Sequence, residues 1–289
     1  MGTRSLWFVH SHLNLVVYGR KKGLTALFLC KKQKGYNENF LAKKDEAMRI
    51  SRLYTPDELN KDKSIELQEH NAHYVRTVLR LRKDQSLTLF NGLGGEFICT
   101  LQEVSRKRVV VNVVKAIERS VESPLHVTLG LGISRGDRMD WAVQKAVELG
   151  VNSITPLLTE RCVIKFKADK KQQKLQHWKH IIQHATEQSG RTILPDLNEI
   201  SDLQDWLHKQ NDLKVFLDPY AEKSLAEVKP DNKRVTLLSG PEGGFSIEER
   251  ELAIDAGFIP VRLGNRILRT ETASLAALSA VQMLWGDFN

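Results

Sequence analysis

Two rhythms of apolar and polar positions follow one another along the chain. From Arg49 to about Glu118, alternating or β-branched runs are separated by short polar turns, "NGLGG" and "SRKR", a pattern typical of strands joined by tight turns. These runs predict strands at 86–92, 95–105 and 108–118, and one helix before them at 70–81. Short strands with a single helix favour a small β-barrel.

From about Val127 the pattern changes, because strand-like runs now alternate with longer helical stretches. The predicted strands are 126–132, 153–158, 213–217, 234–240 and 259–264. The predicted helices are 137–149, 168–189, 201–209, 246–256 and 270–285. Such alternation indicates a parallel sheet covered by helices on both faces, and "VESPLH" before it reads as a linker.

Residues 1–47 stand outside both patterns. Their apolar stretch "SLWFVHSHLNLVVYG" is interrupted by two His and one Asn, which makes it a poor signal-peptide core. They carry nine Lys or Arg and three acidic residues, and therefore +6 of the net charge of +8. We expect residues 1–47 to be an extension outside the fold, with Met48 as the functional start; a genuine basic tail is the alternative.

The composition narrows the class of protein only modestly. The chain has 289 residues, 41% of them hydrophobic, enough for a sizeable core, and no apolar run has the length of a membrane span. Cys30, Cys99 and Cys162 lie far apart without a CxxC pair, as expected in a reduced cytosolic compartment. Since most of the positive charge lies in residues 1–47, a nucleic-acid partner has to be argued from local clusters.

Basic residues cluster around the end of the predicted helix 70–81, just upstream of it, and at the start of a lysine-rich run. The candidates for RNA contact are Arg49, Arg52, Arg76, Arg80, Arg82, Lys165 and Lys167. Arg76 and Arg80 have the spacing of neighbours on one helical face. These clusters suit contacts with phosphates, although they also fit an ordinary solvated surface.

The stretch "TLGLGISRGD" (128–137) places Gly-x-Gly after a predicted strand. Arg135 stands where a dinucleotide-binding fingerprint has its third glycine. We therefore expect Gly130 and Gly132 to permit a tight strand exit, and an NAD-dependent oxidoreductase is a rival interpretation.

Three histidines and one acid share a face of the predicted helix 168–189. His177, His180, His184 and Glu187 are spaced at i, i+3, i+7 and i+10. This spacing does not force chelation, and no Cys or second acid is close in sequence, so we expect no metal. The favoured interpretation is a polar helix face, with Glu187 and Arg191 set at the helix end, where side chains can point into a cleft.

Two glycine-cornered loops follow predicted strands near the C-terminus. In "LLSGPEGGFS" the strand turns and Ser246 begins a helix as a capping box with Glu249. The same order recurs in "IPVRLG", "NRILRTET" and "ASLAALSAVQMLW". In open α/β sheets, ligands bind outside the carboxyl ends of the strands. Glu242 stands where a phosphate loop has its Lys, so the loops suit a flat heterocycle with a neutral or cationic chain.

The combination of "LLSGPEGGFS" and "RLGNRILRTETASLAAL" resembles the SPOUT class of methyltransferases. With "HYVRTVLRL", "DRMDWAVQKAVELGV", "TERCVIK" and "ATEQSGR", the chain is similar to the ribosomal RNA small subunit methyltransferase E family over essentially all residues from Met48. The resemblance implies a PUA-like RNA-binding β-barrel (48–120), a trefoil-knot α/β methyltransferase domain with a parallel sheet (121–289), and a cytoplasmic homodimer.

The same resemblance implies an activity and a set of site residues. The family methylates N3 of a uridine in 16S rRNA with S-adenosyl-L-methionine, and we expect the assembled small ribosomal subunit as substrate. A catalytically silent RNA-binding or assembly factor is the alternative. The cofactor loops fall on Leu238, Gly240, Glu242, Gly243, Leu263, Gly264, Ile267, Leu268 and Thr272.

Uridine N3 carries a proton, so methylation needs a base or cations that stabilise the uridine anion. We expect Arg269 to stabilise that anion, with Arg191 as the second candidate, and Glu271 or Glu187 to be the base. Lys145 and Glu148, three residues apart on one predicted helix, are expected to form a structural ion pair.

Overall fold

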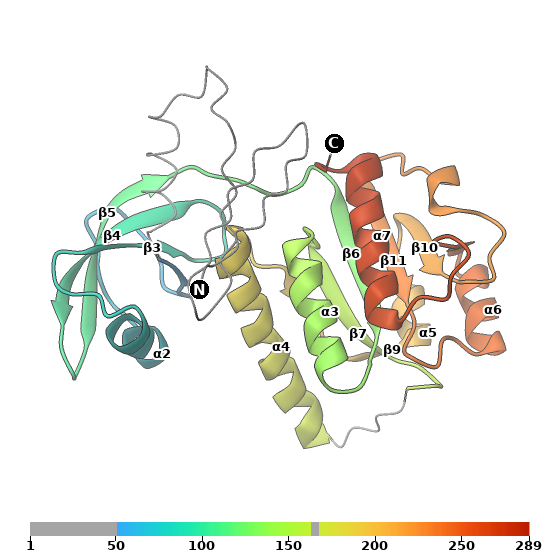
Figure 1. Cartoon of the computed structure of the whole chain (residues 1–289), viewed down its shortest axis with the longest axis horizontal. Helices are drawn as coiled ribbons and strands as arrows, with labels where there is room; N and C mark the ends of the chain where they lie inside the picture. Colours follow the sequence, from blue (N-terminus) through green and yellow to red (C-terminus); the bar gives the residue numbers. More distant parts are fainter. Residues whose placement is uncertain (1–50, 163–167, 289) are drawn as a thin grey trace, which may run out of the picture. The chain divides into compact units, whose positions relative to one another are not determined.

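The structure, a computed structural model, describes residues 51–162 and 168–288, and contains two sheets (Figure 1). The first sheet has the strand order β1-β3-β4-β5-β2. Its strands are β1 Arg52–Tyr54, β2 Ser64–Glu66, β3 Ser86–Phe90, β4 Glu96–Val104 and β5 Val109–Ile117. β1 runs parallel to β3, and the other pairs are antiparallel. We call this part, residues 51–118, the β-region; the predictions for residues 1–47, Arg49, Lys165 and Lys167 lie outside the described residues.

The predicted helix at 70–81 is shorter than expected and changes its winding. Helix α2 (Glu69–His73) continues as a π-helical turn, η1 (Tyr74–Val78), in which the N–H of Leu79 donates to the carbonyl of Tyr74. Arg80 follows with a left-handed backbone at φ 53°, which ends the helix. The prediction that Arg76 and Arg80 are neighbours on one helical face is therefore wrong.

The second sheet is entirely parallel, with the order β12-β10-β11-β6-β7-β8 and β9 beside β7. Its strands are β6 His126–Gly132, β7 Ser153–Leu158, β8 Asp196–Leu197, β9 Ser201–Asp202, β10 Leu213–Leu217, β11 Arg234–Ser239 and β12 Ile259–Val261. Its helices are α3 Asp137–Glu148, α4 Ala168–Ser189, α5 Leu203–Leu207, η2 Leu225–Glu227 (a 3-10 helix), α6 Ile247–Asp255 and α7 Thr270–Trp285. We call residues 121–288 the α/β region.

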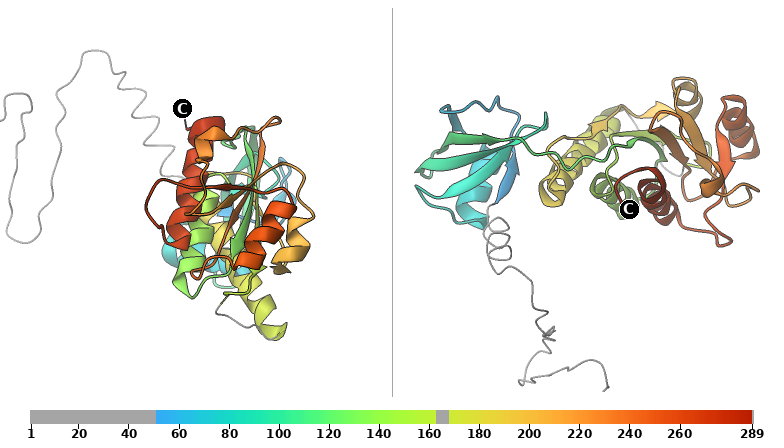
Figure 2. Two further views of the ribbon diagram at one scale, coloured as in Figure 1. Left: turned by 90° about the vertical axis from the view of Figure 1, so that its right-hand side faces the viewer. Right: turned by 90° about the horizontal axis from the view of Figure 1, so that it is seen from above.

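Helices cover both faces of this sheet, which confirms the prediction (Figures 1 and 2). On one face, Leu129 of β6 belongs to a core with Trp178 of α4 and Leu278 of α7. On the other face, Leu238 of β11 packs in a second core with Trp206 of α5. Both faces are apolar because a parallel sheet buried on two sides needs continuous hydrophobic strands.

The longer elements begin and end within a few residues of the predicted bounds, but four strands of two or three residues were not predicted. β1, β2, β8 and β9 are too short to show a periodic pattern. Among the described helices, none combines the length and the apolar character that crossing a bilayer requires.

Gly130 and Gly132 lie inside β6 and serve close packing. A Cβ atom on Gly130 would lie 2.5 Å from the ring of Trp206, and one on Gly132 would lie 2.5 Å from the backbone nitrogen of Pro241. Neighbouring groups fill the space over both glycines, which leaves the dinucleotide interpretation without room. The expected tight strand exit is replaced by close approach of two neighbours.

Candidate functional site

A cavity of about 490 Å³ lies at the carboxyl ends of three adjacent parallel strands, β12, β10 and β11. The registers pair Phe216 with Leu238 and Leu217 with Val261, so the loops that follow these strands leave from one edge of the sheet. The volume is in the range typical of small-molecule sites. This is the edge at which open α/β sheets bind ligands.

The capping box predicted at the start of α6 is confirmed and anchors one cavity loop. The backbone N–H of Glu249 donates to the Ser246 hydroxyl, and the N–H of Ser246 donates to Glu249 Oε2 at 3.0 Å. The other carboxylate oxygen of Glu249 accepts from the N–H of Glu160 at 2.7 Å. The loop after β11 is therefore fixed both to its own helix and to the end of β7.

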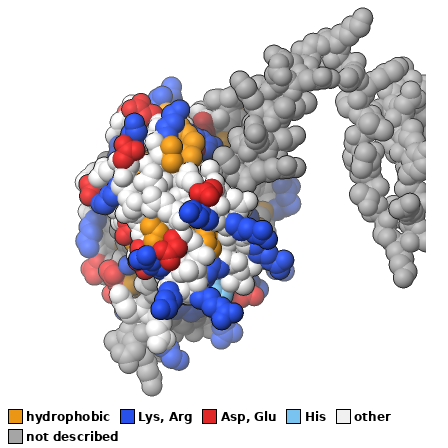
Figure 3. Space-filling view, turned by 90° about the vertical axis from the view of Figure 1, so that its left-hand side faces the viewer, with side chains coloured by type: hydrophobic (Ala, Val, Ile, Leu, Met, Phe, Trp, Pro, Cys, Tyr) orange, Lys and Arg blue, Asp and Glu red, His pale blue; other side chains and the backbone are white. Residues whose placement is uncertain are grey.

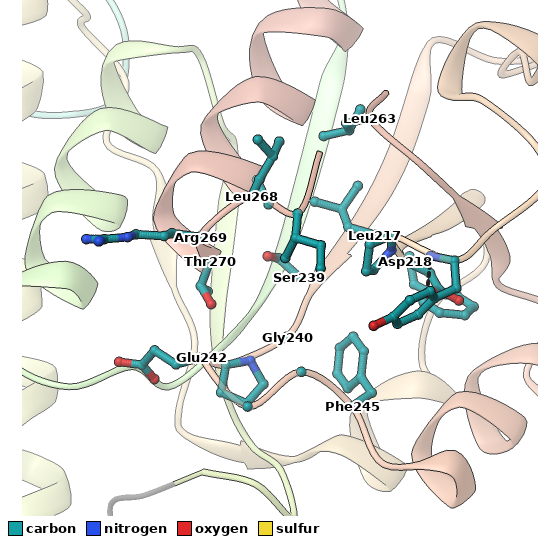
Figure 4. A pocket seen from close by; sticks show the side chains of 18 of the residues that line it. Leu217, Asp218, Ser239, Gly240, Glu242, Phe245, Leu263, Leu268, Arg269 and Thr270 are labelled. Atoms are coloured by element: carbon teal, nitrogen blue, oxygen red, sulfur yellow. Dashed lines mark hydrogen bonds between the residues drawn. The ribbon is translucent and has the colours of Figure 1, made fainter. Parts of the chain in front are cut away.

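Six of the nine residues predicted to bind the cofactor line the cavity: Gly240, Glu242, Gly243, Leu263, Ile267 and Leu268. The other three do not. Leu238 is buried in the core below, Gly264 makes a turn at φ 77°, and Thr272 is exposed on α7. The two glycine-cornered loops thus form two walls of one cavity, as Figure 4 shows.

Glu242 connects the loop after β11 to the start of α3. Its Oε1 accepts from the backbone N–H of Arg135 at 2.9 Å and from Arg138 Nη1 at 3.3 Å. Burial raises the pKa of the carboxyl, but the Arg135 hydrogen bond and the Arg138 charge outweigh burial, so the pKa lies below its ordinary value. The carboxylate therefore holds the loop in place from across the cavity rim.

A third wall was missed in the sequence. Leu217 at the end of β10 and Pro219 and Tyr220 after it line the cavity, and Asp218 is buried and paired with Arg250. The signal was available, because the run "LKVFL" was predicted as a strand and ligands bind beyond the carboxyl ends of such strands. The loop after it carries no glycine corner, and so it did not stand out.

The residues of the cavity fit a flat, uncharged heterocycle attached to a charged chain. Apolar surface comes from Phe216, Leu217, Phe245, Leu263, Ile267 and Leu268. Arginines contribute at the rim, and Figure 4 shows Arg269 and Glu242 on one side and Leu217 and Asp218 on the other. The cavity therefore has one charged side and one mainly apolar side.

Arg269 and Glu271 lie at the start of α7, beside the cavity. Arg269 lines the cavity, is exposed, and its guanidinium forms no hydrogen bond or ion pair within residues 51–162 and 168–288. Glu271 is not among the residues that line the cavity, although Thr270 and Ala273 of the same helix are, and its Oε2 is buried without a hydrogen-bond partner among the described residues. An unpaired cation and an unpaired buried carboxylate oxygen thus stand two residues apart.

Arg191 and Glu187, the other two predicted catalytic residues, do not line the cavity. The Arg191 side chain is 4% exposed, and it donates to Glu122 and to the carbonyls of Val147 and Val151. Glu187 Oε1 accepts from the backbone N–H of Tyr54 at 2.8 Å. These contacts occupy both side chains without a substrate, and we leave them out of the catalytic proposal.

Arg52, predicted to bind RNA, belongs to the same network. Its guanidinium donates to Glu96 in β4 and to the carbonyls of Glu187 and Arg191 at the end of α4. Together with Tyr54, Glu187, Arg191 and Glu122, it forms what we call the α4 junction. This junction joins the β-region to the α/β region.

The other arginines of the β-region differ in how far they are free. Arg76 is mostly buried and is bound to Glu69 and to the carbonyls of Ser105 and Arg106. Arg80 and Arg82 are exposed. Figure 3, which shows the left-hand side of the molecule in Figure 1, has Lys and Arg side chains on its surface with Asp and Glu among them. Arg80 and Arg82 are thus the described members of the cluster that are available to phosphates.

The polar face of α4 uses its histidines for pairwise contacts. His177 hydrogen-bonds Asp140, His180 hydrogen-bonds Gln176, and His184 hydrogen-bonds Glu187. Among the described residues, no group of three His, Cys, Asp or Glu is placed to hold a metal ion. The ion pair predicted between Lys145 and Glu148 is confirmed, at 2.7 Å.

Comparison with known proteins identifies the family of both parts of the chain. Residues 121–282 match a family described as "RNA methyltransferase domain", and residues 67–114 match "RNA methyltransferase PUA domain". These matches place the chain, with its parallel sheet and the cavity at the carboxyl edge of that sheet, in the class of RNA methyltransferase-domain proteins.

Individual relatives narrow the class. A ribosomal RNA small subunit methyltransferase E of Buchnera aphidicola is 37% identical over 243 residues, which cover 83% of this chain and 99% of that protein. The crystal structure of the enzyme of that name from Neisseria gonorrhoeae, bound to S-adenosyl methionine, is 36% identical with a TM-score of 0.78 over 83% of this chain and 100% of that one. A Legionella pneumophila structure with the bound cofactor SAM is 40% identical with a TM-score of 0.80, over 83% of this chain and 99% of that one. The chain belongs to the ribosomal RNA small subunit methyltransferase E family.

Proposed function

We propose that this protein transfers a methyl group from S-adenosyl-L-methionine to ribosomal RNA. The observation that carries the proposal is the cavity at the carboxyl edge of β12, β10 and β11, whose apolar and charged sides suit this cofactor. Two relatives of known structure, at 40% and 36% identity, contain it. The cofactor would be held by Gly240, Leu263 and Leu268, with Ile267 at the rim.

The cofactor supplies a methyl group already activated on a sulfonium, so the protein has to align the acceptor and exclude water. The loops after β10, β11 and β12 provide the walls. The loop after β11 is fixed by Glu249, bound to Glu160, and by Glu242, bound to Arg135 and Arg138. The loop after β10 is fixed by Asp218, bound to Arg250. A site held in this way loses little free energy to reorganisation when the substrate binds.

We further propose that the acceptor is N3 of a uridine in 16S rRNA within the assembled small subunit. Glu271 takes the N3 proton on its carboxylate, and Arg269 stabilises the negative charge that develops on the uridine oxygens. The buried, unpartnered Oε2 of Glu271 and the unpaired guanidinium of Arg269 support these assignments. N3 is occupied in a base pair, so the target uridine is unpaired or extruded.

The remaining expectations form part of the same proposal. Residues 48–120 act as the RNA-binding PUA-like domain, with Arg80 and Arg82 as phosphate contacts, and Arg49, Lys165 and Lys167 as further candidates. Residues 121–289 form a knotted methyltransferase domain that acts as a cytoplasmic homodimer.

Transfer of labelled methyl groups to naked 16S rRNA and to small subunits, followed by nucleoside analysis, tests the proposal. We expect the label in N3-methyluridine, with subunits as the better substrate. Label in another nucleoside contradicts the N3 assignment alone, and preference for naked rRNA contradicts the assembled substrate alone. If neither methyl transfer nor cofactor binding is found by these measurements and by calorimetry, the protein is a catalytically silent RNA-binding factor.

A further inference from the structure

Two of the most exposed large apolar side chains of the described residues line the same cavity. Tyr220, after β10, is 73% exposed, and Ile267, after β12, is 76% exposed; within the described chain only Leu93 exceeds them. Single exposed apolar residues are ordinary on a protein surface. Two of them from separate loops at one cavity indicate apolar surface that a bound molecule covers.

The loop that carries Tyr220 is held rigidly. The Asp218 side chain is 4% exposed, its Oδ1 accepts from the backbone N–H of Tyr220 at 3.0 Å, and its Oδ2 accepts from Arg250 Nη2 at 2.5 Å. Pro219 between them restricts the backbone further. Arg250 Cζ also lies 5.9 Å from the Tyr220 ring centroid. The backbone at Tyr220 is thus held in place, which lowers the conformational entropy lost when a ligand packs on the ring.

The two sides of the cavity distinguish which part of a ligand meets Tyr220. In Figure 4, Leu217 and Asp218, from the segment that leads through Pro219 to Tyr220, lie opposite Arg269 and Glu242. Arg250 and the Tyr220 N–H already bind the Asp218 carboxylate, so this side offers an aromatic ring and aliphatic carbon. An uncharged flat ring fits here, which leaves the reacting methyl on the side of Arg269.

We propose that Tyr220 selects the cofactor by stacking on its adenine ring, and that Asp218 and Arg250 are positioning residues for Tyr220. The inference rests on the proposed function, since it assigns a further contact in the same site. Stacking on an aromatic side chain depends on the face of the base and not on its hydrogen-bonding edge. Tyr220 therefore contributes affinity for the base, while the neighbouring backbone groups are free to recognise its edge.

Calorimetric titration of the full chain with S-adenosylmethionine and with methylthioadenosine tests the contact. Methylthioadenosine keeps the adenosine and lacks the charged amino-acid chain. We expect Tyr220→Ala to weaken both ligands by roughly ten-fold, as base–aromatic stacking predicts, and Tyr220→Phe to stay within about two-fold of the original. Unchanged affinity in Tyr220→Ala overturns the proposal, as does a loss confined to S-adenosylmethionine.

The outcomes separate this proposal from the proposed function. An original protein that binds neither ligand contradicts both. Normal cofactor affinity in Tyr220→Ala with a raised KM for RNA assigns the ring to an RNA base, and so overturns the adenine contact while methyl transfer stands.

A double-mutant cycle tests the positioning role. Asp218→Asn removes the charge that pairs with Arg250, and we expect it to weaken methylthioadenosine in the original background but not in the Tyr220→Ala background. If the losses of methylthioadenosine affinity caused by Asp218→Asn and by Tyr220→Ala are additive in the double variant, Asp218 does not act by positioning Tyr220. Arg250→Gln, which leaves the Asp218 turn intact, provides a second cycle if Asp218→Asn does not fold.

Discussion

The α4 junction and the rim of the cavity both contain arginine side chains, but the surroundings of these side chains differ. At the α4 junction, Arg191 is buried and Arg52 is partly buried, and both are bonded to carboxylates and to backbone carbonyls. At the cavity, Arg269 and Arg266 are exposed, and within the described residues their guanidinium groups have no partner. Arginines of the first kind hold elements together, and those of the second kind are available to a substrate. Residue type alone does not separate the two kinds, whereas burial and partners do.

The largest effect on stability is expected at the α4 junction. Arg191→Ala leaves Glu122, which is 12% exposed, without its guanidinium partner and removes the Arg191 hydrogen bonds to the carbonyls of Val147 and Val151. Breaking a buried ion pair in this way costs about 3–5 kcal/mol, measurable by denaturant unfolding. Lys145→Ala, which breaks the half-exposed pair with Glu148, is the control and costs less than about 1 kcal/mol. An Arg191→Ala protein that is inactive but has unchanged stability would show that Arg191 takes part in the reaction.

At the cavity we expect the opposite result, a loss of activity without a loss of stability. Arg269→Ala should keep its cofactor affinity and unfolding free energy, because the side chain is exposed and unpaired, but lose methyl transfer by roughly 100-fold or more. Single-turnover kinetics check the loss of methyl transfer, and calorimetry on the same preparation checks the unchanged cofactor affinity. Arg262→Ala, in the same loop but outside the cavity lining, should transfer normally. Normal turnover in Arg269→Ala removes Arg269 from the mechanism.

A smaller effect is expected where the cavity loop is anchored. Ser246→Ala removes the capping box of α6 and should cost about 1 kcal/mol of unfolding free energy. It should also weaken cofactor binding, because the loop after β11 ends at this cap. Ser224→Ala removes the equivalent capping box of η2 and should leave binding unchanged. Equal binding by the two variants would show that the cap does not position the loop.

The smallest effect concerns pH at the α4 junction. A hydrogen bond to Glu187 raises the pKa of His184 above its ordinary value. Because the pKa of His184 is raised in the folded state, the contact stabilises the folded protein at pH values below the unfolded pKa of about 6.5. This stabilisation is lost as the pH rises through the pKa of the folded state. The ring is largely exposed, so the contribution stays below about 1 kcal/mol. Unfolding midpoints at pH 5.5 and 8.5 should differ less in His184→Gln than in the original protein, and equal differences would contradict the contact.

Local patterns of the sequence determined much of the fold. The alternation of apolar runs and helical stretches predicted the parallel sheet, and the helices at 168–189 and 270–285 have the predicted bounds. The capping box of Ser246 and Glu249 was predicted because both partners lie within one helical turn. Two loops of the cavity were predicted for a similar reason, since glycine corners after strands mark turns in the sequence itself.

Only the tertiary structure decided the use of charged and aromatic side chains. Glu242 meets Arg135 across more than 100 positions, and Arg191 meets Glu122 across 69. Tyr220 becomes a candidate for stacking only when its loop reaches the cavity. Local propensity acts within a few residues, while burial and charge pairing depend on groups brought together by the whole fold. For this reason two loops of the cavity could be predicted from the sequence, and the separation of structural from available arginines could not.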